Sequence, residues 1–422
     1  MDQFPLEILQ YIFDLLDLRS QVRFIRVCTY FNNMRITDLL NINAIYKTKL
    51  NCNVIKNYKY VKKLWAGYNS GITDEDIKSL NLVDLCADDN LGIKDIGHMT
   101  NLKKLWATDN HGITDEDLKS VNLEELYIAN NPEIKNIGHM TNLRKLRVWN
   151  NCGLTDENFK LLNLVELDVG YNIKIKKIGH MTNLKKLNAR GYSSITDEDL
   201  KSLNLVELDV GNNIKIKKIG HMTNLKKLNA SGDCCITDED IKLLNLVELC
   251  ADFNPKIKNI GHMTNLKKLW ARYDSGITDE DLKSLNLFEL CTDNNHKIKN
   301  ISHMTSLQKL LAFDNSSISG EDLKLLNLVE LHASYNHKIK NIGHMTNLKI
   351  LEAAGNSGIT DEDLKSLNLV DLRADNNPKI KNIGHMTNLK ILDAAGNSGI
   401  TDEDIKSLNL DELYANNNPN IK

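Results

Sequence analysis

The sequence predicts an α/β repeat protein, and three observations support this prediction. A unit of 41 residues recurs without insertion, apolar and polar residues alternate within it, and a helix-capping pattern appears once in each unit. A chain of 422 residues would otherwise suggest two or three domains, but a repeat array can grow in one direction without dividing. The repeat therefore determines the expected architecture.

The repeat is clearest in the tetrapeptide Ile-Gly-His-Met, in which Ser replaces Gly at position 302. Its histidine recurs at intervals of 41 residues, so that eight units run from 60 to 387 and a ninth begins at 388. The histidines are His98, His139, His180, His221, His262, His303, His344 and His385. This regularity predicts that every unit adopts the same local structure.

Each unit divides into a long half of 21 residues, such as 101–121, and a short half of 20 residues, such as 122–141. Both halves carry the pattern L-x-x-L-x-A/V/I-x-x-N-x-x-I. Leu105 and Ala107 alternate with Trp106 and its neighbours, which is the period of a strand with one buried face. Each half therefore predicts one strand.

This pattern resembles the leucine-rich repeat, and it covers most of the chain. The resemblance implies a parallel, curved β-solenoid with one strand from each repeat on its concave face. It also places Asn110 and Asn131 inside the turns, bonded to backbone groups that would otherwise have no partner. Four prolines fit this arrangement, because they follow that asparagine in the loop, where no strand hydrogen bond is lost: Pro132, Pro255, Pro378 and Pro419.

The long half contains a short helix on the other face. Thr114 stands at the N-cap, Asp115, Glu116 and Asp117 fill the first turn, and Lys119 lies towards the end. This order satisfies free N–H groups and complements the helix dipole. The alternative, a calcium site made by the three acids, is rejected because no glycine-turned loop of oxygen ligands surrounds them.

The regular histidines are not expected to bind a metal. Neighbouring histidines lie two strands apart, which is about 10 Å, whereas ligands of one ion lie about 2 Å from it. Met140, next to His139, takes a position where the leucine-rich repeat has a buried leucine, so the histidine should lie at the edge of the convex turn. A structural, hydrogen-bonding role is expected. No metal and no cofactor are predicted.

Residues 1–40 break the period and have a different character. Apolar residues at 5, 8, 9, 12, 13, 15 and 16 form one broad helix face that begins at Pro5. About 40 residues are too few for an independent core, so this segment is either a cap on the solenoid or half of an interface. We expect a helical domain over 1–40, a linker over 41–59 and the solenoid over 60–422.

The helical segment resembles an F-box. The residues that carry the resemblance are 5–9, Pro-Leu-Glu-Ile-Leu, followed by 12–13, 16–18, 27–28 and Phe31, while Phe4 replaces the usual leucine. The resemblance implies that the helices bind a Skp-type adaptor protein through Phe4, Pro5, Leu6, Ile8, Leu9, Ile12 and Val27. The alternative is a helical cap without a partner.

An F-box followed by leucine-rich repeats is similar to the substrate receptors of cullin–RING ubiquitin ligases. The uniform unit with Ile-Gly-His-Met is most similar to such proteins encoded by giant DNA viruses of amoebae, whose ligase machinery would be the host's. The resemblance implies a non-catalytic receptor. Two alternatives are a binding scaffold without a ubiquitin link and an enzyme; the sequence contains no G-x-S-x-G, Walker or H-E-x-x-H motif that would favour the enzyme.

The composition limits the classes of partner and the cellular compartment that we expect for this protein. A net charge of −3 argues against binding nucleic acid through bulk charge, and no run of 18 apolar residues could span a membrane. The start lacks the Lys or Arg of a signal peptide, and the eight cysteines show no C-x-x-C spacing. These features predict free thiols in the cytoplasm or nucleus, of the host cell if the protein is viral.

The strand motif L1-x2-x3-L4-x5-x6-x7 also indicates where a target would bind. Position 3 alternates in sign from Lys63 and Asp84 to Glu330, a self-neutralising ladder that ends at Ile350 and Ile391. Position 5 varies freely, as a recognition face would, although drift at an unconstrained surface would look similar. The alternation at position 3 therefore leaves no continuous basic stripe that could bind nucleic acid.

All four tryptophans lie at positions 5 or 7, on the expected concave side. Exposed Trp and Tyr are frequent interface anchors, so we predict a target-binding surface; the alternative is that these rings pack on one another and on neighbouring lysine stems. The predicted residues are Trp65, Trp106, Tyr127, Arg147 and Trp149 near the F-box, with Trp270, Arg272 and Tyr273 further along.

Overall fold

A computed structural model of the chain describes residues 38–39 and 61–422. The predicted F-box, with its adaptor-binding residues, and the predicted linker lie outside the described residues, apart from the short strand β1 at Asp38–Leu39. The chain forms two compact units, residues 1–205 and 206–422, and each is described by itself.

In the first unit, each half of the repeat contributes one strand of three residues, and neighbouring strands pair in parallel in chain order. Matching motif positions face each other, as in Lys104 opposite Glu125. The strands are β2 Lys63–Trp65, β3 Asp84–Cys86, β4 Lys104–Trp106, β5 Glu125–Tyr127, β6 Lys145–Arg147, β7 Glu166–Asp168 and β8 Lys186–Asn188; the helices are η2 Tyr68–Ser70, α5 Asp74–Ile77, α6 Asp115–Leu118, α7 Asp156–Phe159 and α8 Asp197–Leu200.

The second unit repeats this arrangement with the same register. Its strands are β9 Glu207–Asp209, β10 Lys227–Asn229, β11 Glu248–Cys250, β12 Lys268–Trp270, β13 Glu289–Cys291, β14 Lys309–Leu311, β15 Glu330–His332, β16 Ile350–Glu352, β17 Asp371–Arg373, β18 Ile391–Asp393 and β19 Glu412–Tyr414. Its helices are α9 Asp238–Ile241, α10 Asp279–Leu282, η3 Glu321–Leu323, α11 Asp361–Leu364 and α12 Asp402–Ile405.

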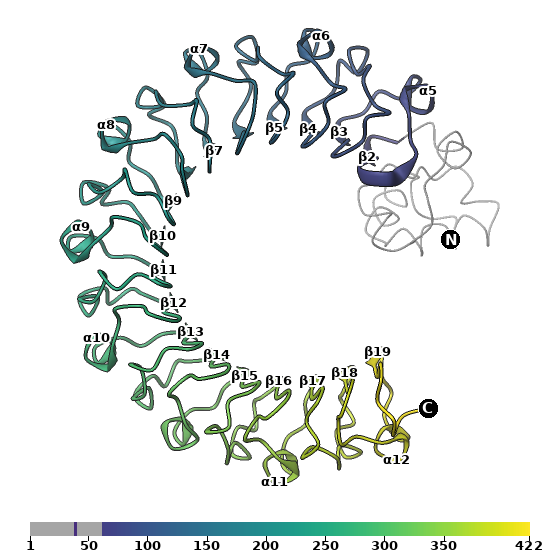
Figure 1. The fold of residues 1–422 in the computed structure, drawn as a ribbon, viewed down its shortest axis with the longest axis vertical. Helices are drawn as coiled ribbons and strands as arrows, with labels where there is room; N and C mark the ends of the chain where they lie inside the picture. The colour runs from purple at the N-terminus through teal and green to yellow at the C-terminus, as the bar shows by residue number, and fades with distance from the viewer. Residues whose placement is uncertain (1–37, 40–60) are drawn as a thin grey trace, which may run out of the picture. The chain divides into compact units, whose positions relative to one another are not determined.

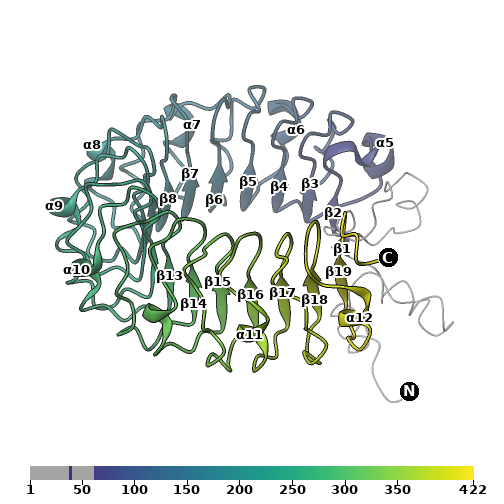
Figure 2. The ribbon, with the colours of Figure 1, turned by 60° about the horizontal axis from the view of Figure 1, so that its bottom comes forward.

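Within each unit the strands line the inner edge and the short helices lie on the outer edge (Figure 1). Figure 2 shows the strands of each unit side by side, with their chains running in the same direction. This arrangement confirms the predicted α/β leucine-rich-repeat solenoid. Among residues 61–422, no helix is both long enough and apolar enough to cross a lipid bilayer.

The core lies between the strands and the outer edge, and it is built from the apolar positions of the motif. Leu105 and Ala107 are fully buried, whereas their neighbours Lys104 and Trp106 remain partly accessible, as the alternation predicts. Met140 is also fully buried, in the slot expected for a leucine. Each half therefore adds one layer of apolar side chains, whose burial is the main driving force for folding.

A buried asparagine closes the turn after each strand of the short halves. In Asn336, the side-chain amide donates to the carbonyl oxygen of Ala312 at 2.9 Å, and Oδ1 accepts from the backbone N–H of Lys338 at 3.0 Å. The equivalent residues are all buried: Asn90, Asn131, Asn172, Asn213, Asn254, Asn295, Asn336, Asn377 and Asn418. The predicted role of this asparagine is therefore confirmed in the short halves.

The long halves differ from the short halves in this turn. Asn110 is buried as predicted, but Asn356, at the same motif position, is exposed. The other long halves bury the next residue instead, a serine or cysteine: Ser70, Cys152, Ser193, Cys234, Ser275, Ser316, Ser357 and Ser398. A short hydroxyl or thiol at this place can bond within its own loop, as the Ser70 hydroxyl does to the carbonyl oxygen of Ala66 at 2.9 Å.

The residue before this turn has a left-handed backbone in each half of the described array. It is often Asn or Asp, which tolerate this conformation, and it is glycine at 191, 232, 355 and 396. A Cβ at Gly191 would collide with the ring of Tyr171, which occupies the same position one repeat earlier. The backbone angle favours glycine there, and the space needed by the Tyr171 ring requires it.

The acidic helix start is structural, as predicted. In α6 the hydroxyl and backbone N–H of Thr114 both donate to Asp117 at 2.8 Å, while Asp115 accepts from the N–H groups of Lys135 and Asn136 in the next half. Glu116 pairs with Lys119 at 2.6 Å. All three acids thus have partners within the fold.

The repeated histidine closes the other end of the same helix. His139 Nε2 lies 3.0 Å from the carbonyl oxygen of Leu118, the last residue of α6, and the same bond joins His180 to Phe159 and His385 to Leu364. Since a carbonyl can only accept, Nε2 carries the proton. The expected hydrogen-bonding role is confirmed.

We predict that Asn336→Ala destabilises the protein, because it leaves the Ala312 carbonyl and the Lys338 N–H buried without partners, at a cost of about 1–3 kcal/mol for each unsatisfied group. The matched control is Asn356→Ala, the same change at the same motif position but on the surface. Thermal unfolding should show a lower midpoint for the first variant only. Equal losses in both variants would contradict the assigned role.

Candidate protein-binding face

Positions 3, 5 and 7 of each strand motif form the accessible inner face of each unit. Position 3 carries the predicted charge ladder: in the first unit Glu125 lies 3.1 Å from Lys104 and 3.3 Å from Lys145. In the second unit, Lys268 lies 3.3 Å from Glu289. The alternation is confirmed, and it leaves this row of side chains nearly neutral.

Three predicted target-binding residues of the first unit form one stack. The rings of Trp106 and Tyr127 are parallel, 5.2 Å apart, and the guanidinium of Arg147 lies 5.0 Å from the centre of the Tyr127 ring. Tyr127 also donates to Glu125 at 3.1 Å, and Arg147 lies 3.5 Å from Glu166. The stack crosses β4, β5 and β6 and presents a continuous aromatic and cationic surface.

The other two residues of this group lie apart from the stack. The ring centres of Trp65 and Tyr68 lie 5.7 Å apart. In the sheet, Cys86 on β3 lies between Trp65 on β2 and Trp106 on β4. Trp149, at position 7, is 37% exposed. The rings therefore pack on one another in part, as the alternative held, while keeping accessible surface.

The Tyr127 hydroxyl is a weaker acid than an ordinary tyrosine hydroxyl. Burial, together with the negative charge of Glu125, raises its pKa to about 12. The hydroxyl therefore stays protonated and acts as a hydrogen-bond donor across the ordinary pH range.

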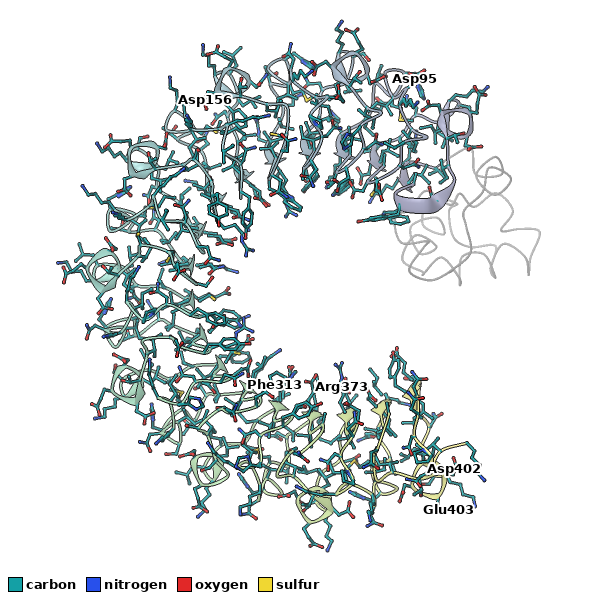
Figure 3. All side chains as sticks on the ribbon, in the orientation of Figure 1. Asp95, Asp156, Phe313, Arg373, Asp402 and Glu403 are labelled. Carbon is teal, nitrogen blue, oxygen red and sulfur yellow. The ribbon has the colours of Figure 1, made fainter. Side chains whose placement is uncertain are left out.

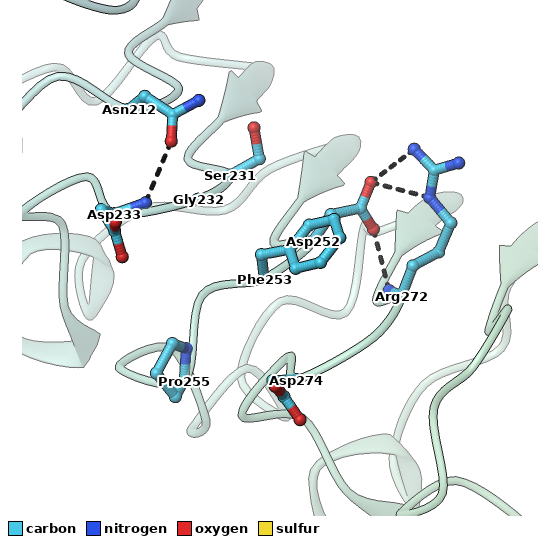
Figure 4. A pocket seen from close by; sticks show the side chains of 9 residues that line it. All are labelled: Asn212, Ser231, Gly232, Asp233, Asp252, Phe253, Pro255, Arg272 and Asp274. Carbon is cyan, nitrogen blue, oxygen red and sulfur yellow. Dashed lines mark hydrogen bonds and ion pairs between the residues drawn. The ribbon is translucent and has the colours of Figure 1, made fainter.

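In the second unit, Arg272 is held by the fold. Its guanidinium contacts the buried carboxylate of Asp252 through Nη2 at 2.7 Å and Nε at 2.9 Å, and its backbone N–H also donates to Asp252 (Figure 4). The hydrogen bond to Asp252 raises the pKa of Arg272 further above its usual value. Both guanidinium nitrogens contact the same oxygen, Oδ2 of Asp252. The pair lines a hollow of 590 Å³ with Asn212, Ser231, Gly232, Asp233, Phe253, Pro255 and Asp274.

Trp270 and Tyr273 take different positions around this pair. Trp270 lies on β12, between Cys250 on β11 and Cys291 on β13. Tyr273 stacks on Phe253 with ring centres 4.0 Å apart. The predicted group of the second unit therefore consists of the partly accessible Trp270 on β12 and of Arg272 and Tyr273, which follow the strand.

The position-5 cysteines are hydrogen-bond donors. Cys250 donates to Asp252 at 3.3 Å, and Cys291 donates to Asp293 at 3.1 Å. Burial, with the charge of the neighbouring carboxylate, raises the pKa of the Cys250 thiol to about 12. A thiol that stays protonated is a poor nucleophile.

Sequence reasoning missed a series of left-handed aromatic residues on this face. Tyr171, Phe253 and Tyr335 have positive φ angles, as does the predicted Tyr273, which is unusual for bulky residues, and each of the four is at least 36% exposed. The sequence does contain a sign of these rings, because Tyr171 and Tyr335 are each followed one repeat later by a glycine at the same position, which leaves room for the ring. The rings of Tyr171, Phe253 and Tyr335 add accessible aromatic surface beyond the predicted residues.

A second feature that the sequence only hinted at is an ionic cluster on β15–β17. His332 lies 2.5 Å from Glu330 and 2.9 Å from Glu352, and Glu352 also lies 3.1 Å from Arg373. Although burial alone lowers the pKa of His332, its hydrogen bonds to Glu352 and Glu330 raise that pKa overall. The hydrogen bond from His332 lowers the pKa of Glu352.

We predict a pH-dependent contribution of His332 to stability. Because its pKa is raised in the folded state, the stabilisation is fully present below the ordinary value of 6.5 and is lost as pH rises through the raised pKa. It is also lost in acid, as pH falls through the lowered pKa of Glu352.

Chemical unfolding of wild type and His332→Gln across pH measures this contribution. The difference in unfolding free energy should be largest in mildly acidic solution and shrink on both sides. The control is His337→Gln, at an exposed histidine. A difference for His332→Gln that does not change with pH would refute the ionic role of this histidine.

Comparison with known proteins adds two findings. Residues 1–34 match the family model of the F-box domain. A search of curated proteins finds no match.

Several solved structures share the fold. A TLR13–ssRNA13 complex matches with 20% identity and a TM-score of 0.54 over 90% of this chain, which spans 65% of the other chain. The mouse RP105/MD-1 complex matches with 16% identity and a TM-score of 0.53, covering 87% of this chain and 73% of the other. An LRR protein of Leptospira interrogans is less similar in shape, with 20% identity, 96% and 94% coverage and a TM-score of 0.33.

The F-box match precedes the repeats, and the repeats form parallel three-residue strands in a regular array. The chain therefore combines a match to the F-box domain model over residues 1–34 with repeats that have the leucine-rich-repeat fold.

Proposed function

We propose that the protein is the substrate-recognition subunit of an SCF-type, cullin–RING ubiquitin ligase. The observation that supports this most is the F-box match over residues 1–34, placed before an array whose inner face varies on a fixed frame. F-box domains generally bind Skp-type adaptors, and leucine-rich repeats generally bind proteins. We place the F-box at 1–40, a linker at 41–59 and the target-binding solenoid at 60–422.

In this role the chain performs no chemistry of its own. The adaptor, bound through Phe4, Pro5, Leu6, Ile8, Leu9, Ile12 and Val27, links it to the ligase, and the solenoid holds a target protein near the ubiquitin-loaded enzyme. Holding two reactants together raises their effective concentration and orients the acceptor lysine. The site of action is the cytoplasm or nucleus, and in a host cell the ligase machinery would be the host's if the chain is viral.

A protein target agrees better with the inner face than a nucleic acid does. The TLR13 structure contains single-stranded RNA, but the ladder of this chain alternates lysine with glutamate and offers no basic stripe to a phosphate backbone. The accessible stack of Trp106, Tyr127 and Arg147 has instead the composition of a protein interface. A binding scaffold without a ubiquitin link is the second candidate, and adaptor binding separates the two.

We expect Leu9→Asp combined with Ile12→Asp to abolish binding of a purified Skp-type adaptor, because the change places two charges on the apolar helix face that the sequence predicts and that a 40-residue segment cannot bury alone. The control, Gln3→Asp with Gln10→Asp, adds the same charge at polar positions and should keep binding. Both full-length variants should unfold at the wild-type temperature. If the wild type does not bind the adaptor, the ubiquitin ligase proposal fails.

We expect Trp106→Ala and Trp149→Ala each to weaken target binding by about 2 kcal/mol, roughly 30-fold in dissociation constant, because exposed tryptophans act as anchors. Binding of an identified target would be measured by calorimetry, with thermal unfolding to confirm that the frame is intact. Trp270→Ala serves as the comparison in the second unit. Wild-type affinity in the Trp106/Trp149 double variant would move the surface to Trp270, Arg272 and Tyr273.

A further inference from the structure

The charge ladder changes character in the second unit, at β15–β19. Before this point each acid at position 3 is followed by a lysine on the next strand, as Glu289 is followed by Lys309. On β16 and β18 the lysine is replaced by Ile350 and Ile391. Asp371, on the strand between them, therefore faces an isoleucine on each side instead of two lysines.

The loss of these lysines leaves an excess of carboxylates on the inner face. Position 3, 5 or 7 of β15–β19 holds Glu330, Glu352, Asp371, Asp375, Asp393 and Glu412, whereas the cationic groups at these positions are Arg373 and His332. Lys309, His332 and Arg373 are engaged with Glu330 and Glu352. On β2–β8, the same positions hold acids and bases in nearly equal numbers.

Asp371 shows independently that the carboxylates of this surface are short of hydrogen-bond donors. The residue is 8% exposed, and its Oδ1 accepts no hydrogen bond within the described structure. The closest cationic group is Nε of Arg373, 3.6 Å away, which is longer than a hydrogen bond. Burial raises the pKa of this carboxyl group. A buried carboxylate oxygen without a donor is costly, so a donor from a bound partner would stabilise it.

The adjoining surface has the shape and chemistry for a long basic side chain. A hollow of 280 Å³ is lined by Arg373, Ile391, Asp393, Glu412 and Tyr414. Two carboxylates there can pair with a charged head group, while Ile391 and the Tyr414 ring offer apolar surface to the methylene stem of a lysine or arginine. Arg373, which lies on the inner edge of the second unit (Figure 3), shows the kind of contact, because its own guanidinium pairs with Glu352.

We infer that the inner face of β15–β19 binds a polypeptide segment rich in lysine and arginine. This inference rests on the proposed function, since it gives the chemistry of the target segment that the receptor holds. Binding itself requires neither the adaptor nor the F-box, so it can be tested separately. Charge complementarity selects such a segment, and the apolar contacts of Ile350 and Ile391 replace the lysines that close the ladder elsewhere.

The probe is a fluorescein-labelled peptide in which arginine alternates with serine, and binding to the full chain is followed by fluorescence anisotropy with EDTA present. Wild type should bind this peptide with an affinity that falls as salt rises, and should not bind the peptide with citrulline in place of arginine. Asp371→Asn, Asp375→Asn and Asp393→Asn together should weaken binding by roughly tenfold or more.

Two further variants make the test specific. Glu207→Gln, Glu248→Gln and Glu289→Gln remove the same charge from the intact part of the ladder and should leave the affinity unchanged. Ile350→Lys with Ile391→Lys restores the ladder, gives Asp371 its missing partners and should abolish peptide binding while the unfolding temperature is kept.

Three results would overturn the inference. The first is equal weakening by the two triple variants, which would indicate attraction by net charge alone. The second is undiminished binding in the lysine-restored variant. The third is binding of calcium ions by wild type without binding of the peptide, which would assign the carboxylates to a metal. Failure of adaptor binding with retained peptide binding would refute only the proposed ligase role.

Discussion

The structure depends on one constraint, the satisfaction of buried backbone groups at every turn. Strands of three residues leave carbonyls such as that of Ala312 inside the array, where water cannot reach them, and Asn336 supplies the missing donor across 24 positions of sequence. The same side chain accepts from its own loop, so each asparagine ties a turn to the previous repeat. Since the core is apolar and its layers are alike, these bonds set the register, and the register places the variable side chains of the inner face.

Much of the fold could be predicted because it follows from local patterns. The alternation around Leu105, the capping order from Thr114 to Lys119 and the buried Met140 all hold in the structure. The buried serine or cysteine of the long halves could not be predicted from the motif, because both halves share the same spacing around this turn, and only three-dimensional packing shows which of two polar neighbours faces inward.

The candidate site was less predictable for the same reason. The sequence indicates that Trp106, Tyr127 and Arg147 share a face, but their stacking depends on side-chain angles, and Trp65 turns instead to Tyr68. The hydrogen bond from Arg272 to Asp252 links two repeats across 20 residues of sequence, and no local sequence pattern predicts it. Left-handed tyrosines are likewise a tertiary outcome, because the space over Gly191 compensates for the backbone strain at Tyr171.

The charge ladder explains why a departure from the repeat is informative. Each exposed lysine–glutamate pair stabilises the fold by only about 0–1 kcal/mol, so selection for stability alone does not fix the alternation. Its larger effect is to keep the inner face neutral, which suppresses binding to polyanions and polycations alike. Where Ile350 and Ile391 replace lysine, that suppression ends, and Asp371 stays buried beside apolar neighbours with an oxygen that lacks a donor. A frame that otherwise pairs its charges therefore leaves carboxylates accessible on β17–β19, and a cationic partner is the ligand that these carboxylates can bind with least cost.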